Sequence, residues 1–189
     1  MTRDEILEAA AQIFREKGFH AASMQDIAVA VNLQKASLYH HVSSKQEILL
    51  ALLDRALDLL IEHIEGVISQ PLSPDEKLRR AMRVYLKVML ENRDLAAVLL
   101  LEHRSLAPQY QARHIPRRDR FERAWRDLIK EGHQQRLFSC TDPALASRFV
   151  LGVLNWSITW YRPDGPLSPT EIADQFAELF LRGLLIREI

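Results

Sequence analysis

The sequence has little of what secreted, membrane-spanning or β-rich proteins need. Its single cysteine, Cys140, cannot form an internal disulfide, so we expect a reducing compartment, the cytoplasm. Only six glycines are present, and no Asn-Gly or Asp-Gly turn separates alternating apolar runs, which argues against an all-β protein. Charged or amide residues interrupt every apolar stretch before it reaches membrane-spanning length, and the start Arg3-Asp4-Glu5 is unlike a signal peptide. We therefore expect no membrane partner.

Residue patterns that would indicate catalysis or a metal site are also missing from the sequence. There is no glycine-rich phosphate-binding loop, and Cys140 has no evident activating neighbour. Four histidines lack a partner at metal-ligand spacing: His63, His103, His114 and His133. We expect no metal, no cofactor and no catalytic residue, with a small helical enzyme kept as an alternative.

The composition of the sequence is ordinary for a soluble globular protein, and its balanced charge favours no class of partner. The 189 residues are 48% apolar and 26% charged, with 25 basic and 25 acidic side chains. A protein that binds DNA over its whole surface would be basic, whereas one that uses a small module need not be.

Helix-start signals recur along the chain. Five pairs have the spacing at which a hydroxyl and a carboxylate cap a helix N-terminus: Thr2 and Glu5, Ser23 and Asp26, Ser44 and Glu47, Ser73 and Glu76, Ser168 and Glu171. Proline at the first helical position marks further starts at Pro74, Pro143 and Pro169, and we expect Pro116 to open another helix.

Apolar spacing near 3.6 residues predicts an all-α protein of about nine helices. The predicted ranges are 3–17, 24–31, 35–41, 45–68, 75–91, 95–104, 117–135, 143–160 and 169–186. We expect a three-helix N-terminal head over residues 1–48 and a helical ligand-binding and dimerisation body over residues 49–189.

The segment from Ser23 to Val42 predicts a helix-turn-helix. Ala28 is small where the two helices must cross, and Asn32 tolerates the left-handed conformation that the turn requires. A small apolar core remains to hold the crossing: Ile27, Val31, Leu33, Leu38 and Val42. The exposed face of the second helix then carries Gln34, Lys35, Ser37, Tyr39 and His40, which suit base edges and phosphates. On these residues alone, a plain helical hairpin with a solvated polar face stays open.

This segment resembles the signature of the TetR family of bacterial regulators. The resemblance rests on Ile27-Ala28, on Leu38-Tyr39-His40-His41 and on Ser44-Lys45 with Leu49, and it covers about the first fifty residues. The chain departs from the family pattern at Asn32, Gln34, Ala36 and Val42.

The resemblance implies a sequence-specific transcriptional repressor that binds double-stranded operator DNA. Under this assignment Tyr39, His41 and Lys45 contact phosphates, and Lys35, Ser37 and His40 face bases or backbone. The alternative is a helical adaptor whose head binds protein, which would lack salt-sensitive duplex binding.

The last two predicted helices indicate a homodimer. The helix over 143–160 is apolar on every side, so we expect all of its faces to be buried. The last helix has two apolar stripes, one more than a single protomer needs. We expect a partner to cover Leu154, Ala173, Ala177, Leu181 and Leu184, in a way that resembles how family members dimerise.

Large side chains of the middle helices predict a pocket for a small apolar effector. The expected lining residues are Tyr85, Met89, Phe121, Trp125, Phe149 and Trp156, each of which has a plain core role as its alternative. Arg117 and Arg118 belong to an arginine-rich stretch that is either a phosphate clamp or a solvated face. The segment Trp160–Ser168 resembles a loop of relatives that respond to acyl-CoA thioesters, so a CoA thioester is the first expected effector.

Overall fold

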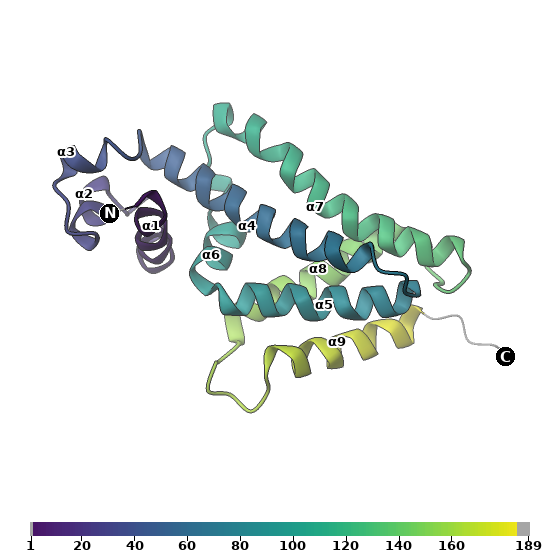
Figure 1. Ribbon diagram of the computed structural model, residues 1–189. Coiled ribbons are helices and arrows are strands. Elements are labelled where there is room, and N and C mark those ends of the chain that lie inside the picture. Colours follow the sequence, from purple (N-terminus) through teal and green to yellow (C-terminus); the bar gives the residue numbers. More distant parts are fainter. Residues whose placement is uncertain (1, 185–189) are drawn as a thin grey trace. The chain divides into compact units, whose positions relative to one another are not determined.

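The computed structural model describes residues 2–184, and these form nine α-helices and two short helical turns (Figure 1). The helices are α1 (Arg3–Lys17), α2 (Met24–Ala30), α3 (Lys35–Leu38), α4 (Lys45–Ile68), α5 (Pro74–Glu91), α6 (Arg93–Ala97), α7 (Pro108–Gln134), α8 (Pro143–Trp160) and α9 (Pro169–Leu184). The predicted all-α class is confirmed. The predicted end of the last helix, at residues 185–186, lies outside the described residues.

Predicted capping pairs start several of these helices. Thr2 with Glu5, and Ser23 with Asp26, form complete capping boxes at α1 and α2. Ser168 and Glu171 exchange the same two hydrogen bonds before α9.

The two other predicted pairs cap differently. The Ser44 hydroxyl accepts from the Glu47 N–H, but the Glu47 carboxylate returns to the Ser43 N–H. Glu76 accepts from Arg80 Nε at 2.8 Å.

Three predicted helices differ from the observed ones. The helix expected over 35–41 ends at Leu38, and residues 39–41 form a turn. The helix expected over 95–104 is three short elements: α6, then a π-helical turn (η1, Val98–Glu102) and a 3₁₀ turn (η2, His103–Ser105). The expectation that Pro116 opens a helix is wrong, because α7 already begins at Pro108 and Pro116 lies inside it. Pro108, not Pro116, takes the first helical position, where the missing N–H costs nothing.

The chain forms two compact units, each with its own core. The first comprises Met1–Asp58 and Asn92–Arg118, and the second comprises Leu59–Glu91 and Asp119–Ile189. The helices α4 and α7 each continue from one unit into the other.

In the first unit, α1 packs against α2 and α6, and α2 packs against α3. Ile6, Ile27 and Leu38 are fully buried there. The first unit therefore contains both the helix-turn-helix and α6, which is distant from it in the sequence.

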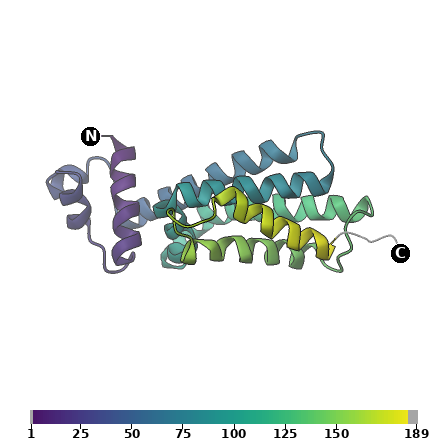
Figure 2. The ribbon, with the colours of Figure 1, turned by 90° about the horizontal axis from the view of Figure 1, so that it is seen from below.

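In the second unit, α9 runs along α5, and α8 also packs on α5 (Figures 1 and 2). Leu78, Trp125 and Leu154 are fully buried in its core. No helix within residues 2–184 is long and apolar enough to cross a bilayer.

Candidate DNA-binding face and ligand-binding body

The turn between α2 and α3 has the geometry that Asn32 predicted. Asn32 has a positive φ of 54°, and Ala28 is fully buried where the helices cross. The Leu33 N–H donates to the Ala28 carbonyl at 2.8 Å, which closes the turn. The crossing of α2 and α3 therefore depends on the small side chain of Ala28 and on the left-handed backbone conformation of Asn32.

In α3 and the turn that follows it, apolar side chains are buried and polar side chains are exposed. Leu38 and Val42 are buried beneath it. Five of the predicted DNA contacts are exposed, namely Gln34, Lys35, Tyr39, His40 and His41, and Ser37 is half-buried. Tyr39 keeps 46% of its surface although it is a large ring, so it is available for stacking or phosphate contact. We call these six residues the recognition face.

Lys45 has a different environment from the one predicted. Its ammonium group donates to the carbonyl oxygens of Phe19, His20 and Ala22 at 2.7, 3.3 and 2.6 Å, and it lies 4.5 Å from the centre of the Phe19 ring. An ammonium group has three hydrogens, and these carbonyls accept all of them. In this structure Lys45 therefore holds the loop between α1 and α2 against α4, and its direct phosphate contact stays a prediction.

A second set of polar contacts fastens this loop to the segment after α6. Glu102 accepts from the Phe19 N–H at 3.1 Å and from the Ser105 hydroxyl at 3.0 Å. The Gln46 amide bridges the Ser105 carbonyl and the Ala107 N–H at 2.9 and 2.8 Å. Sequence reasoning missed these residues because Glu102 and Phe19, and Gln46 and its two partners, are more than fifty positions apart.

The neighbouring His103 has an altered acidity. Burial lowers the pKa of its imidazole, and the nearby charges of Arg104 and Arg118 lower it further. His103 is therefore neutral over a wider pH range than an ordinary histidine.

The middle of the second unit contains an aromatic cluster of Tyr85, Phe121 and Trp125. The Tyr85 ring centre lies 5.9 Å from Phe121 and 5.8 Å from Trp125. The Tyr85 hydroxyl donates to the Asn155 side-chain oxygen, and burial raises the pKa of Tyr85. Met89 is also buried in the body. The structure thus brings together three of the predicted ligand-lining residues and adds Asn155.

One polar atom in this cluster has no partner. Trp125 is fully buried, and its indole N–H is the single buried side-chain donor or acceptor without a hydrogen bond among residues 2–184. An unsatisfied buried donor costs about 1–3 kcal/mol, so its presence at the centre of a core calls for an acceptor.

The predicted arginine clamp is already engaged by acidic residues. Arg117 pairs with Asp54 at 3.1 Å and with Asp58 at 3.0 Å, both on α4. Arg120 forms a two-pronged pair with Glu65. Arg118 is exposed and interacts with its surroundings. Because these carboxylates neutralise the guanidinium groups, the stretch is closer to the solvated, paired face than to an open phosphate site.

The two aromatic residues of α8 that were expected in the pocket lie on the surface. Phe149 is 61% exposed and Trp156 is 67% exposed, so one protomer does not enclose them, and their contact with a ligand stays a prediction. Leu145 on the same helix and Leu179 on α9 are exposed as well. We call these four residues the apolar stripe. The expectation that every face of α8 is buried fails within one protomer.

The residues expected to face a partner are instead buried inside the protomer. Leu154, Ala173, Ala177, Leu181 and Leu184 are each at most 7% exposed. The helix α9 has two apolar sides, and the side with the small residues packs on α5. Alanines allow that close packing, so this side of α9 belongs to the protomer's own core and not to a contact with a partner.

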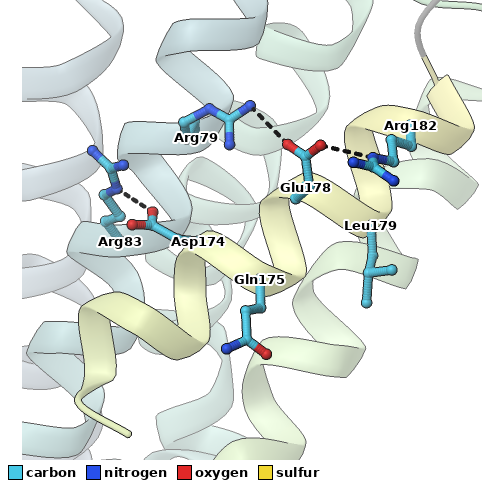
Figure 3. A pocket seen from close by; sticks show the side chains of 7 residues that line it. All are labelled: Arg79, Arg83, Asp174, Gln175, Glu178, Leu179 and Arg182. Carbon is cyan, nitrogen blue, oxygen red and sulfur yellow. Dashed lines mark hydrogen bonds and ion pairs between the residues drawn. The ribbon is translucent and has the colours of Figure 1, made fainter.

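A groove between α5 and α9 is lined by three arginines, but each one is paired (Figure 3). Arg83 pairs with Asp174, while Arg79 and Arg182 both reach Glu178. These pairs leave the groove without a free cationic group for an anion.

Comparisons with known proteins agree with the geometry of the head. The family described as "Bacterial regulatory proteins, tetR family" matches residues 6–52, and the "Tetracyclin repressor-like, C-terminal domain" matches residues 71–184. The chain is 30% identical over 184 residues to the transcriptional repressor KstR2 of Mycobacterium tuberculosis, covering 96% of this chain and 92% of the relative.

Solved structures give the same assignment. The regulator PfmR from Thermus thermophilus superposes with a TM-score of 0.87 at 42% identity, covering 94% of this chain and 97% of that one. AibR, solved in complex with isovaleryl coenzyme A and operator DNA, superposes with a TM-score of 0.85 at 30% identity over 94% of this chain and 96% of its own. The chain therefore belongs to the TetR family and is a helix-turn-helix transcriptional repressor, not an enzyme.

Proposed function

We propose that this repressor binds operator DNA as a homodimer through the recognition face and leaves it when an acyl-coenzyme A thioester binds the body. The observation that carries the proposal is the exposure of Lys35, Tyr39, His40 and His41 above the buried Leu38. Donors and a ring on a short exposed helix and the turn that follows it suit base edges and phosphates in a major groove.

In this proposal residues 1–48 form the DNA-binding head and residues 49–189 the ligand-binding and dimerisation body. Helix α4 starts at Lys45, beside the recognition face in sequence, and continues into the second unit as far as Ile68. A rearrangement of the body is therefore passed along a continuous helix to the head. Because the proposed partner is operator DNA, we infer that the protein is cytoplasmic.

The apolar stripe supports a second copy of the chain as its partner. Leu145, Phe149, Trp156 and Leu179 each expose more than 60% of their surface. Beside them, Phe149 stacks on Phe180, with ring centres 5.6 Å apart, and both line an apolar hollow of about 220 Å³. An isologous pair would bury the stripe and present two heads to two half-sites.

The effector class rests on AibR, whose solved structure contains isovaleryl coenzyme A. A thioester of this kind joins an apolar acyl chain to a phosphate-bearing nucleotide. The aromatic cluster offers apolar surface for the first part, and the unpartnered Trp125 N–H offers a donor for a carbonyl oxygen.

The proposal is tested by titrating isovaleryl and octanoyl coenzyme A into a complex of the protein with DNA from its own promoter. We expect release, followed as a fall in fluorescence anisotropy of the labelled duplex. Linkage requires that operator DNA weaken thioester binding by the same factor. Equal thioester affinity of free and DNA-bound protein would exclude release by this class of ligand and leave the DNA-binding assignment intact.

A further inference from the structure

A second groove of the body lies between α7 and α8 and has a volume of about 250 Å³. Its polar and small lining residues are Glu122, Arg126, Ser147, Arg148, Gly152 and Asn155. It therefore combines two guanidinium groups, one carboxylate and two neutral hydrogen-bonding side chains.

The arginines of this groove differ from those of the α5–α9 groove in being unpaired. Neither Arg126 nor Arg148 has an ion-pair or hydrogen-bond partner within residues 2–184. In the α5–α9 groove, by contrast, Asp174 and Glu178 engage every arginine (Figure 3). The one carboxylate in the α7–α8 groove, Glu122, already interacts with its own surroundings. Two unpaired guanidinium groups lining one groove suit the oxygens of a phosphate.

Asn155 connects this groove to the aromatic cluster. Its side chain lines the groove and also accepts the hydrogen bond from the Tyr85 hydroxyl. Tyr85 contacts Trp125 edge to face, and the Trp125 N–H lacks an acceptor. A polar groove and an unsatisfied buried donor are thus separated by one Tyr–Asn pair.

We propose that this α7–α8 groove binds the phosphates of the effector through Arg126 and Arg148, and that the Tyr85–Asn155 hydrogen bond is a latch between the groove and the core. When the latch opens, the acyl part enters the aromatic cluster and its thioester oxygen accepts from the Trp125 N–H. The inference rests on the proposed effector class and assigns the residues that receive it.

The groove is tested with a double variant, Arg126→Ala with Arg148→Ala. Calorimetric titration of isovaleryl coenzyme A, octanoyl coenzyme A and coenzyme A itself is expected to show at least about tenfold weaker binding, as the loss of charge-assisted hydrogen bonds requires. The affinity for the free acids should not change. Arg79→Ala with Arg182→Ala removes the same charge from the α5–α9 groove and serves as the control, which should bind like wild type.

The latch is tested with Tyr85→Phe, which keeps the ring and removes the hydroxyl. A latch predicts tighter thioester binding, because no hydrogen bond must be broken, whereas a merely structural hydroxyl predicts unchanged or weaker binding. Trp125→Phe removes the donor and should weaken the thioester more than coenzyme A.

Space in the groove is tested at Gly152, where an added Cβ meets no atom within 4 Å. Gly152→Leu should block thioester binding, while Gly66→Leu, which is equally unhindered and lies on α4, should not. Sedimentation of both variants must show the wild-type oligomeric state, so that blocking is not a result of dissociation.

The outcomes separate this inference from the proposed function. Suppose that the wild-type protein binds a thioester and releases DNA, and that the Arg126→Ala/Arg148→Ala variant binds the thioester with the same affinity. The assignment of the phosphates to this groove is then wrong, while the proposed function stands. Wild-type protein that binds neither thioester overturns both the effector class and the groove.

Discussion

The ammonium group of Lys45 lies 2.6 Å from the carbonyl oxygen of Ala22, which joins the first residue of α4 to the loop before α2. The same group reaches the carbonyl of Phe19, so one side chain holds both ends of the loop. The recognition face is thereby positioned by a residue that does not itself belong to it.

This relationship predicts that Lys45→Met lowers the stability of the fold while leaving the salt dependence of DNA binding nearly unchanged. Charge-assisted hydrogen bonds of a half-buried group are worth about 2 kcal/mol together, and methionine preserves the stem over Phe19. Urea unfolding gives the stability, and the slope of log affinity against log salt gives the number of phosphate contacts.

Lys35→Ala is the matched comparison for the salt experiment. It is exposed on the recognition face, so its loss should flatten the slope by about one unit. If Lys45→Met flattened the slope as much as Lys35→Ala without loss of stability, Lys45 would be a phosphate contact after all.

Two glycines within helices predict opposite effects of substitution by alanine. A Cβ on Gly132 would come within 2.2 Å of the buried Phe138 ring, so Gly132→Ala should destabilise the protein by about 1–3 kcal/mol. Nothing lies within 4 Å of a Cβ on Gly66, so Gly66→Ala should stabilise α4 by about 0.5–1 kcal/mol. Thermal unfolding of the two variants side by side checks both signs, and a stabilised Gly132→Ala would refute the described packing of Phe138.

The cap of α2 predicts a pH-dependent stability. The pKa of Asp26 is lowered by its hydrogen bond with Lys17, 2.7 Å away, and further by Ser23. A lowered folded pKa means that this carboxylate stabilises the fold above its unfolded pKa of about 3.9 and loses that contribution as the pH falls towards the folded value. Asp26→Asn should therefore cost more stability at pH 7 than at pH 3, as measured by urea unfolding at both. A cost that does not depend on pH would show that the charge contributes nothing.

The apolar stripe predicts a dimer that a single charged substitution within the stripe disrupts. Trp156→Glu would place a charge in the proposed contact and should give monomers at micromolar concentration in analytical ultracentrifugation. Leu101→Glu is the control, because Leu101 is 65% exposed and does not belong to the apolar stripe. A monomeric wild-type protein would contradict the dimer itself.

The parts of the fold that local signals determine were predictable from the sequence. Capping pairs and 3.6-residue periodicity located α1, α8 and the start of α9, because a helix start depends on groups only three residues apart. The turn at Asn32 was predictable for the same reason, since its backbone conformation is a local property.

Features that depend on distant residues were not predictable in this way. Lys45 has the sequence context of a phosphate contact, and only the folded chain brings three carbonyls to it. Periodicity shows that α9 has two apolar sides, but which side faces α5 depends on packing across about ninety residues. The arginines of α7 were recognised as a cluster, whereas their carboxylate partners on α4 follow from tertiary structure.

The central claim is that the recognition face reads operator DNA, and the most direct test is the affinity for a duplex from the chain's own promoter compared with a random duplex. We expect the protein to prefer its own sequence by about a thousandfold or more at physiological salt. Tyr39→Ala and His40→Ala should lower that ratio, whereas Gln12→Ala, at an exposed position of α1 outside the recognition face, should not. Equal affinity for both duplexes, unchanged by substitutions in the recognition face, would show that this face does not read operator DNA.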